Sequence, residues 1–233
     1  MNNKYNPYPP VNIKNRQWPN NTITKSPTWC TVDLRDGNQA LVEPMDSIRK
    51  MRMFKQLLDM GFKEIEIGFP SASETDFNFV RELILDNHIP SDVTVQVLTQ
   101  ARKPLIEKTI QSLEGCNRAI IHLYNSTSTL QREVVFRETM EGVKKIVTNG
   151  AKIIAEKLSK LQSPNIRLQY SPESFTGTEL PYALEVCESV LDIWEASIDK
   201  PVIINLPATV EMSTPNIHAD QIEWMAKNFS DRN

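Results

Sequence analysis

The segment Thr31–Ala40, TVDLRDGNQA, places an arginine directly before an aspartate where a strand-like stretch breaks off. The carboxylate of Asp36 is suited to bind a hard divalent cation. The guanidinium of Arg35 is always charged, so it can stabilise an oxyanion that develops on a carbonyl group held by that cation. Gly37 permits the sharp exit from the strand. For a single Arg-Asp pair, an ion-paired strand end without a catalytic role is the alternative.

Two later segments end in polar side chains that alternate with apolar ones. In IIHLYNSTS, the alternation puts His122 and Tyr124 on one face of a strand. In YSPESFTGTEL, Ser171 and Glu173 share a side where Pro172 is expected to end the strand. A hydroxyl can bind a carboxylate substrate, and a carboxylate can transfer a proton. The alternatives are that His122 is a core histidine with all its hydrogen bonds made, and that Glu173 stabilises the positive end of a helix dipole.

The last polar segment, INLPATVE, contributes Asn205 and Thr209 at the end of the sixth expected strand. Both are small polar residues that suit a substrate site and a turn equally well. Glu64 and Glu66 alternate with isoleucines in KEIEIGFP. An inward glutamate in a buried strand is costly unless other groups satisfy it. We therefore expect one of the two to support the site from behind, with simple exposure as the alternative.

Six strand-like segments, each followed by a stretch with helical spacing, must position these residues. The six are WCTVDL, EIEIGF, VTVQVLT, RAIIHLY, IRLQYS and PVIINLP. Strands that alternate with helices predict a parallel sheet. The first helix is expected to begin near Asp46 and to end at Gly61. Its inward-facing residues are expected to be Ile48, Met51, Phe54 and Leu58.

Two parallel-sheet architectures fit this repeat, an open doubly wound sheet and a (β/α)8 barrel. The open sheet usually shows a glycine-rich first turn, whereas this chain has 7 glycines and neither a GxGxxG nor a GxxxxGK[ST] motif. The polar residues follow the carboxyl ends of the strands, where barrel enzymes build their sites. We therefore expect a TIM (β/α)8-type barrel over residues 28–233. An Asn- and Pro-rich arm, residues 1–27, is expected to lie over this domain or a neighbouring subunit.

Composition narrows the class of partner. A chain of 233 residues with 40% hydrophobic and 24% charged residues is typical of one globular domain. A net charge of -3 with scattered lysines and arginines gives no reason to expect nucleic-acid binding. No apolar run approaches the ~20 residues of a membrane span, and no signal-peptide core is present, so we expect a cytoplasmic protein. Cys30, Cys116 and Cys187 lack CxxC spacing and are expected to be reduced.

Five segments together resemble the 2-isopropylmalate synthases of the longer subfamily: DLRDGNQA, KEIEIGFPSASETDF, IHLYNSTS, QYSPESFTGTEL and NLPATVEMSTPN. The resemblance runs from about Trp18 to the last residue. LRDG alone is shared with homocitrate synthases, citramalate synthases and 3-hydroxy-3-methylglutaryl-CoA lyases, whereas SPESFTGTE and NLPATVE are more specific. The resemblance implies a Claisen condensation of acetyl-CoA with 2-oxoisovalerate and hydrolysis of the thioester, the first committed step of leucine biosynthesis.

The same resemblance implies roles for individual residues. Asp36 is expected to bind a divalent metal, magnesium or manganese with zinc as the alternative. Arg35 is expected to stabilise the developing alkoxide, and Glu173 to take part in proton transfer. The residues expected to hold the oxoacid are His122, Ser171, Thr209 and Asn205. Acetyl-CoA is the implied co-substrate, and a homodimer is the implied assembly of the full-length protein.

One part of the family pattern is missing from this chain. The family completes its metal site with two histidines in an HxH motif on the seventh strand, but the 3 histidines here, His88, His122 and His218, form no such pair. About six strand-helix units are encoded, where a closed barrel needs eight. We therefore expect a fragment that is truncated after about six units, with the first and sixth strands as edges. The alternatives are a homocitrate- or citramalate-type synthase and a non-catalytic truncated product.

Overall fold

The computed structural model describes residues 8–159 and 165–230. Within them, six parallel strands form one sheet in the order β1 to β6, so each strand pairs with its neighbours in sequence. The strands are β1 (Cys30–Thr31), β2 (Glu64–Gly68), β3 (Thr94–Gln100), β4 (Ala119–Ser126), β5 (Ile166–Glu173) and β6 (Val202–Ile204). This order confirms the predicted six-unit part of a (β/α) barrel, with β1 and β6 at the edges.

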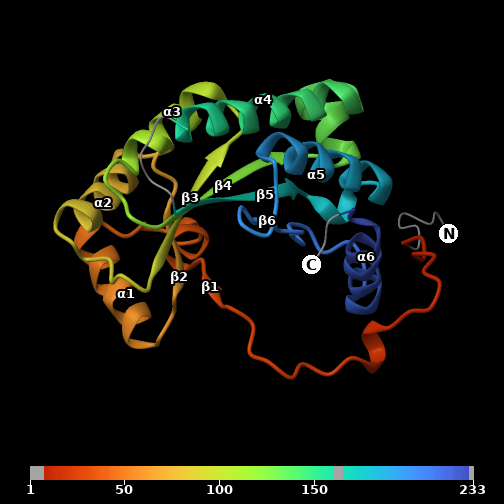
Figure 1. Cartoon of the computed structure of the whole chain (residues 1–233), viewed down its shortest axis with the longest axis horizontal. Helices are drawn as coiled ribbons and strands as arrows, with labels where there is room; N and C mark the ends of the chain where they lie inside the picture. Colours follow the sequence, from red (N-terminus) through yellow and green to blue (C-terminus); the bar gives the residue numbers. More distant parts are fainter. Residues whose placement is uncertain (1–7, 160–164, 231–233) are drawn as a thin grey trace.

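Helices follow the strands along one side of the curved sheet, as Figure 1 shows for α1 to α5. Within the described ranges the α-helices are α1 (Ser47–Asp59), α2 (Glu74–Leu85), α3 (Lys103–Ser112), α4 (Met140–Leu158), α5 (Leu180–Trp194) and α6 (Pro215–Asn228). The shorter helices are η1 (Trp18–Asn20), η2 (Asp33–Gly37), η3 (Gln131–Phe136) and η4 (Phe175–Gly177). None of the helices in the described part of the chain is both long and apolar enough to cross a membrane.

The hydrophobic core lies between the sheet and these helices. The strand residues on that side are apolar and buried: Ile65, Ile67, Val95, Val97, Ile121, Leu123, Leu168 and Tyr170. Their neighbours on the opposite side of the same strands are polar, among them Glu66, Gln96, His122 and Ser171. Because side chains alternate along a strand, one pattern separates the core from the candidate site.

Helix α1 agrees with the prediction at both ends but not along its buried face. Asp46 caps its first turn, and Gly61 follows it with a φ of 90°. Ile48 was predicted to face inward, yet it is 75% exposed, while Lys50 is 0% exposed. At ~100° per residue, Lys50 lies about 40° around the helix from the buried Phe54, whereas Ile48 lies about 120° away.

Strand β5 is longer than predicted. Pro172 does not end it, because β5 continues to Glu173 and remains paired with β4. Beyond the last pair, the backbone N–H of Thr127 still donates to the carbonyl of Glu173 at 3.1 Å. Proline lacks an N–H donor but keeps its φ compatible with an extended chain, so one proline does not stop the strand. The extension places Glu173 at the carboxyl end of β5, where the chain leaves the sheet.

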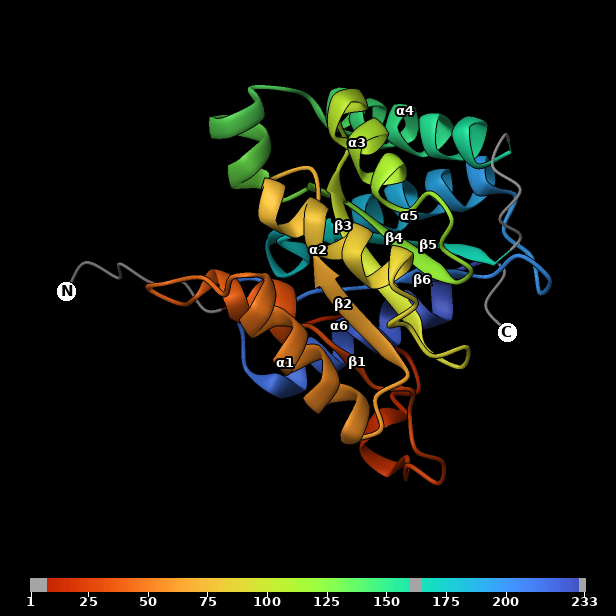
Figure 2. The same ribbon diagram turned by 90° about the vertical axis from the view of Figure 1, so that its left-hand side faces the viewer.

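The N-terminal segment crosses from one edge of the sheet to α6. Residues 1–7 of the predicted arm lie outside the described residues, and residues 8–27 run past the open side of the sheet (Figures 1 and 2). The indole N–H of Trp18 donates to Asp220 of α6 at 2.7 Å, and Arg16 pairs with the same carboxylate at 2.6 Å. These bonds hold the arm against the last helix.

Candidate functional site

Arg35 and Asp36 lie in η2, directly after β1. Strand β1 is shorter than predicted, because the carbonyl of Val32 accepts three successive backbone N–H groups, beginning with that of Arg35, at 2.8 to 3.3 Å. The chain therefore turns at the carboxyl end of the strand, and Arg35 donates from Nε to Glu66 of β2. The side chain of Asp36 is 61% exposed and accepts from Nη1 of Arg35 at 2.7 Å.

A row of hydrogen bonds crosses the inner side of the sheet. The carboxylate of Glu66 lies 2.7 Å from Nδ1 of His122, and Nε2 of His122 lies 2.7 Å from the hydroxyl oxygen of Ser171. Ser171 also accepts from the side-chain amide of Asn205 at 2.8 Å. We call Glu66, His122 and Ser171 the interior row; Arg35 and Asn205 contact its two ends. The structure thus brings together five polar residues from different strands and loops.

The ionised carboxylate of Glu66 fixes the direction of the first hydrogen bond in the interior row. An ionised carboxylate only accepts, so Nδ1 of His122 carries a proton and donates it to Glu66. At the other ring nitrogen, Nε2 of His122 is hydrogen-bonded to the hydroxyl group of Ser171, whose oxygen also accepts from Asn205. Gln96 also donates to Glu66, so its 3.2 Å approach to Nδ1 of His122 is a contact between two donors. Glu66 therefore accepts at one end of the row, and Asn205 donates to Ser171 at the other.

Glu66 is the electrostatic centre of the site. Its side chain is 0% exposed, and burial, the strongest influence, raises its pKa. Hydrogen bonds from His122 and Gln96 and the charge of Arg35 outweigh burial and hold the pKa of Glu66 at about 2. Burial, followed by the charge of Glu66, raises the pKa of Cys30 to about 12. The site therefore holds a permanent buried carboxylate beside a neutral thiol.

The other predicted residues lie nearer to solvent at the same strand ends. We call Asp36, Glu173 and Thr209 the rim. Glu173 is half-buried and accepts from the hydroxyl of Ser126 at 2.6 Å. Thr209 is exposed, and its hydroxyl accepts the backbone N–H of Ser174 at 3.1 Å. This bond places Thr209 beside the end of β5 rather than in the interior row.

The described residues do not by themselves fit a complete divalent-metal site. Within residues 8–159 and 165–230, no group of three or more His, Cys, Asp or Glu side chains converges. A site that holds a catalytic metal needs about three protein ligands. Asp36 offers one exposed carboxylate. It can therefore serve as one ligand of a larger set.

Three supporting residues were missed by the sequence analysis. Gln96 alternates with valines in VTVQVLT, and Ser126 continues the alternation of His122 along β4, so the period of two carried a signal for both. Lys50 carried none, because a lysine in an amphipathic helix normally faces solvent. Its position is explained by the two backbone carbonyl groups and the Asp76 carboxylate that surround its ammonium group.

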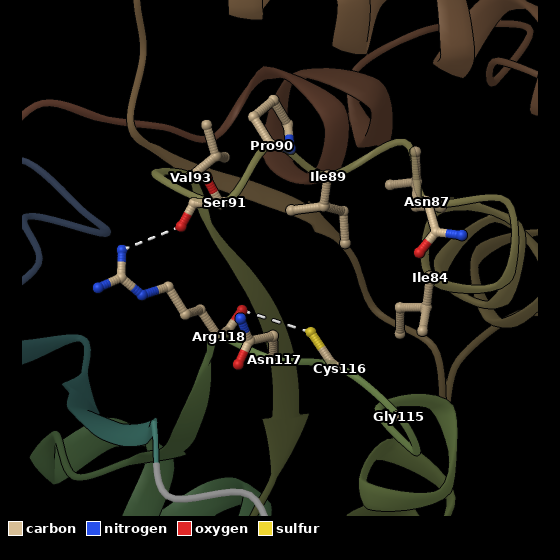
Figure 3. Close-up of a pocket in the computed structure, with 11 residues that line it drawn as sticks. Ile84, Asn87, Ile89, Pro90, Ser91, Val93, Gly115, Cys116, Asn117 and Arg118 are labelled. Carbon is tan, nitrogen blue, oxygen red and sulfur yellow. Dashed lines mark hydrogen bonds between the residues drawn. The ribbon is translucent and has the colours of Figure 1, made fainter.

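A separate small pocket lies away from this site, between the segments that lead into β3 and β4 (Figure 3). Its volume is about 100 Å³. Arg118 donates to the carbonyl of Ser91 at 3.2 Å, and the thiol of Cys116 donates to the carbonyl of Arg118 at 3.4 Å. The pocket is at the amino ends of the strands, where barrel proteins carry stabilising rather than reactive groups. We therefore place the candidate site at the opposite end.

Parallel strands in sequential order, outer helices and polar side chains at the carboxyl ends of the strands define the α/β-barrel class. The HMGL-like family matches residues 26–233, and the chain belongs to this family. This membership confirms the predicted fold class.

The chain is also similar to curated proteins named 2-isopropylmalate synthase. The one from Parafrankia sp. (strain EAN1pec) is 62% identical over 230 residues, which cover 98% of this chain and 41% of that protein. The one from Rhodospirillum rubrum is 58% identical over 230 residues, with the same coverage. The one from Clostridium acetobutylicum is 56% identical over 232 residues, 99% of this chain and 42% of that protein. The predicted resemblance is confirmed, and the chain spans about two fifths of the length of these relatives.

Proposed function

We propose that this chain carries the oxoacid-binding part of a 2-isopropylmalate synthase, which condenses acetyl-CoA with 2-oxoisovalerate. The observation that carries this proposal is the interior row, which holds Arg35 at one end and Asn205 at the other. The row occurs in a chain that is 56 to 62% identical to relatives of that name. A 2-oxoacid presents a carboxylate and a ketone oxygen, and both need hydrogen-bond donors or positive charge.

Arg35 is proposed to stabilise the alkoxide that forms on the ketone oxygen. In the reaction, a proton leaves the acetyl methyl group, the methyl carbon bonds to the ketone carbon, and the ketone oxygen takes the electron pair. A guanidinium that is fixed in advance stabilises this charge without reorganising. Glu66 holds Arg35 through Nε, while η2 fixes its backbone, so the cation is oriented before substrate binds.

The oxoacid itself is proposed to bind Ser171, His122, Asn205 and Thr209. Ser171 and Asn205 supply a hydroxyl and an amide, and the amide of Asn205 donates to the hydroxyl oxygen of Ser171. Thr209 adds a hydroxyl at the rim. A bound carboxylate would replace part of this internal bonding with bonds of similar strength, so binding would leave no buried donor unsatisfied.

Glu173 is proposed to take part in proton transfer at the rim. It is half-buried, and Ser126 fixes one of its oxygens at 2.6 Å. This position suits a group that meets the methyl carbon of acetyl-CoA at the open side of the site. Water then cleaves the carbon-sulfur bond of the thioester and releases coenzyme A. A divalent metal, magnesium or manganese with zinc as the alternative, is the proposed cofactor, with Asp36 as one ligand.

The proposal is tested with the native protein purified from its source cells, by measuring the release of coenzyme A from acetyl-CoA. We expect turnover with 2-oxoisovalerate and little with 2-oxoglutarate or pyruvate. A preference for 2-oxoglutarate or pyruvate would instead assign a homocitrate- or citramalate-type synthase. An absence of turnover with all three oxoacids would favour a non-catalytic product.

A matched pair of variants, introduced into the gene, separates catalysis from folding. Asp36→Ala should abolish metal-dependent turnover while the protein stays folded. Asp92→Ala removes an exposed aspartate that pairs with Lys63 at 2.5 Å before β3, and should leave turnover unchanged. A loss of activity in Asp36→Ala that is caused only by unfolding would contradict the proposed role. Light scattering of the native protein tests the proposed homodimer, and cell fractionation tests the proposed cytoplasmic location.

A further inference from the structure

Lys50 is a fully buried charge beneath the candidate site. Its side chain extends from α1 and is 0% exposed. The ammonium group donates to the carbonyl of Leu34 at 3.1 Å and to the carbonyl of Ile67 at 3.2 Å, and it pairs with Asp76 of α2. A buried ammonium group is costly unless all its donors are engaged, and here three acceptors surround it. Its position is therefore tightly constrained.

The two carbonyl groups that Lys50 binds belong to residues next to the charged pair Arg35 and Glu66. Leu34 directly precedes Arg35 in η2, and Ile67 directly follows Glu66 in β2. One ammonium group thus links the turn that carries the guanidinium to the strand that carries its carboxylate partner. The spacing between the two backbones depends on this bridge.

Asp76 locks the bridge from the other side. In addition to its pair with Lys50, the carboxylate of Asp76 accepts the backbone N–H of Phe69 at 2.7 Å. The backbone N–H of Asp76 donates to the hydroxyl oxygen of Ser73 at 3.0 Å. A side chain on Gly68 would lie 2.9 Å from the carboxyl carbon of Asp76, so only glycine permits this approach. The carboxylate is therefore fixed by α2 and by the end of β2 together.

We propose that Lys50 is a positioning residue that sets the relative placement of Arg35 and Glu66, and so aims the guanidinium at the oxoacid. The inference rests on the proposed function for its substrate, but its geometry is independent of it. Displacing a reacting group by about 1 Å can cost roughly 100-fold in rate. Loss of the bridge is therefore expected to lower kcat by about 100-fold in the properly folded protein.

The experiment compares Lys50→Met with the double variant Lys50→Met/Asp76→Asn, both in the native protein. The double variant removes both charges, and replacing a complete buried pair is tolerated much better than leaving one charge alone. It therefore keeps the test valid if Lys50→Met fails to fold. The matched control is Lys63→Met, which breaks a Lys-Asp pair that is exposed at the other end of β2.

Two readouts are measured in each folded variant. The first is the set of 15N-detected resonances of Arg35 Nε–H and His122 Nδ1–H, which report the two bonds to Glu66. The second is kcat with 2-oxoisovalerate. We expect the double variant to shift both resonances and to lose about 100-fold in kcat, while Lys63→Met changes neither. Unchanged resonances and unchanged kcat in the folded double variant would overturn the proposal.

The two readouts also separate this proposal from the proposed function. If the resonances shift but the wild-type protein turns over no oxoacid, Lys50 positions the pair and the assigned reaction is wrong. If wild-type turnover is present and the resonances of the double variant do not move, the reaction stands and the role of Lys50 is wrong.

Discussion

The interior row and the rim occupy the same end of the sheet but differ in their access to water. Glu66 is 0% exposed and its oxygens accept from Arg35, Gln96 and His122, whereas the side chain of Asp36 is 61% exposed. The row is satisfied by protein groups alone, so its geometry belongs to the fold. The rim carries groups that solvent can reach, and these are free to bind a ligand. Under the proposed function, the row would fix Arg35 and the oxoacid-binding groups in place, and the rim would supply Asp36 and Glu173.

Burial is what gives the interior row its rigidity. In a low-dielectric interior, a satisfied network of hydrogen bonds is strong, and a broken one is costly. At the rim, the same types of carboxylate are screened by water, and their pairs contribute little to stability. Substitutions in the two regions should therefore differ strongly in their effect on folding.

The largest effect is expected for Glu66→Gln. Removing the buried charge leaves Arg35 with only the exposed Asp36 as an ionic partner, and breaking one side of a buried pair costs about 3–5 kcal/mol. Urea denaturation measures the loss in the free energy of unfolding. The matched control is Glu64→Gln on the same strand, which loses a more exposed pair with Arg167 and should cost about 1 kcal/mol or less. Equal losses in the two variants would erase the distinction between buried and solvated positions.

The pH dependence of stability should show the same carboxylate. Folding lowers the pKa of Glu66 from 4.5 to about 2, because the hydrogen bonds and charges of His122 and Arg35 outweigh burial. Stability from this group is present above pH 4.5 and is lost as the pH falls toward 2, by roughly 3 kcal/mol. Urea midpoints between pH 5 and 2 should fall less steeply in Glu66→Gln than in the wild type. Parallel curves would show that folding does not lower the pKa of Glu66.

A smaller effect is expected for Ser126→Ala, which frees Glu173 at the boundary between the two regions. A hydrogen bond to a charged group contributes about 1.5–3 kcal/mol when fully buried, and half-burial places this one near 1 kcal/mol. Thermal unfolding measures the change. The control is Ser159→Ala, whose exposed hydroxyl donates to a backbone carbonyl at 2.9 Å and should matter less. An effect as large as that of Glu66→Gln would show that Glu173 stabilises the fold as strongly as the interior row does.

The smallest effect on stability is expected for Asp36→Asn at the rim. Its carboxylate is exposed, so the free energy of unfolding should change by less than about 0.5 kcal/mol. Affinity for Mn²⁺, followed in the native protein by electron paramagnetic resonance, should nevertheless fall at least about tenfold if Asp36 is a ligand. Glu43→Gln removes an exposed carboxylate in the next loop and should leave the affinity unchanged. A large loss of stability in Asp36→Asn would show that Asp36 has a structural role.

Alternation along the strands allowed much of the site to be predicted from sequence. A period of two placed His122 on one face of β4 and Ser171 on one face of β5, and the parallel register then brought the two strands side by side. It also marked Glu64 and Glu66 as an unusual pair. The period of two did not show which of the two glutamates is buried. Their burial depends on the partners that lie across the sheet, and these partners come from distant segments.

The features that were not predicted depend on backbone groups rather than on side-chain patterns. The turn η2 forms because one carbonyl, that of Val32, collects three N–H groups. Lys50 is buried because two carbonyls and a carboxylate converge on it. A hydrophobic pattern contains no information on either arrangement, so it assigned Ile48 to the buried face instead.

The central claim is that the interior row is built before substrate arrives and that the oxoacid binds at its Ser171 end. It is tested most directly by the 15N spectrum of His122 in the native protein, recorded with and without 2-oxoisovalerate. We predict a proton on Nδ1, directed at Glu66, and we expect the oxoacid to shift the Nε2 resonance much more than the Nδ1 resonance. An unprotonated Nδ1 in the free protein, or a spectrum that 2-oxoisovalerate leaves unchanged, would contradict the claim.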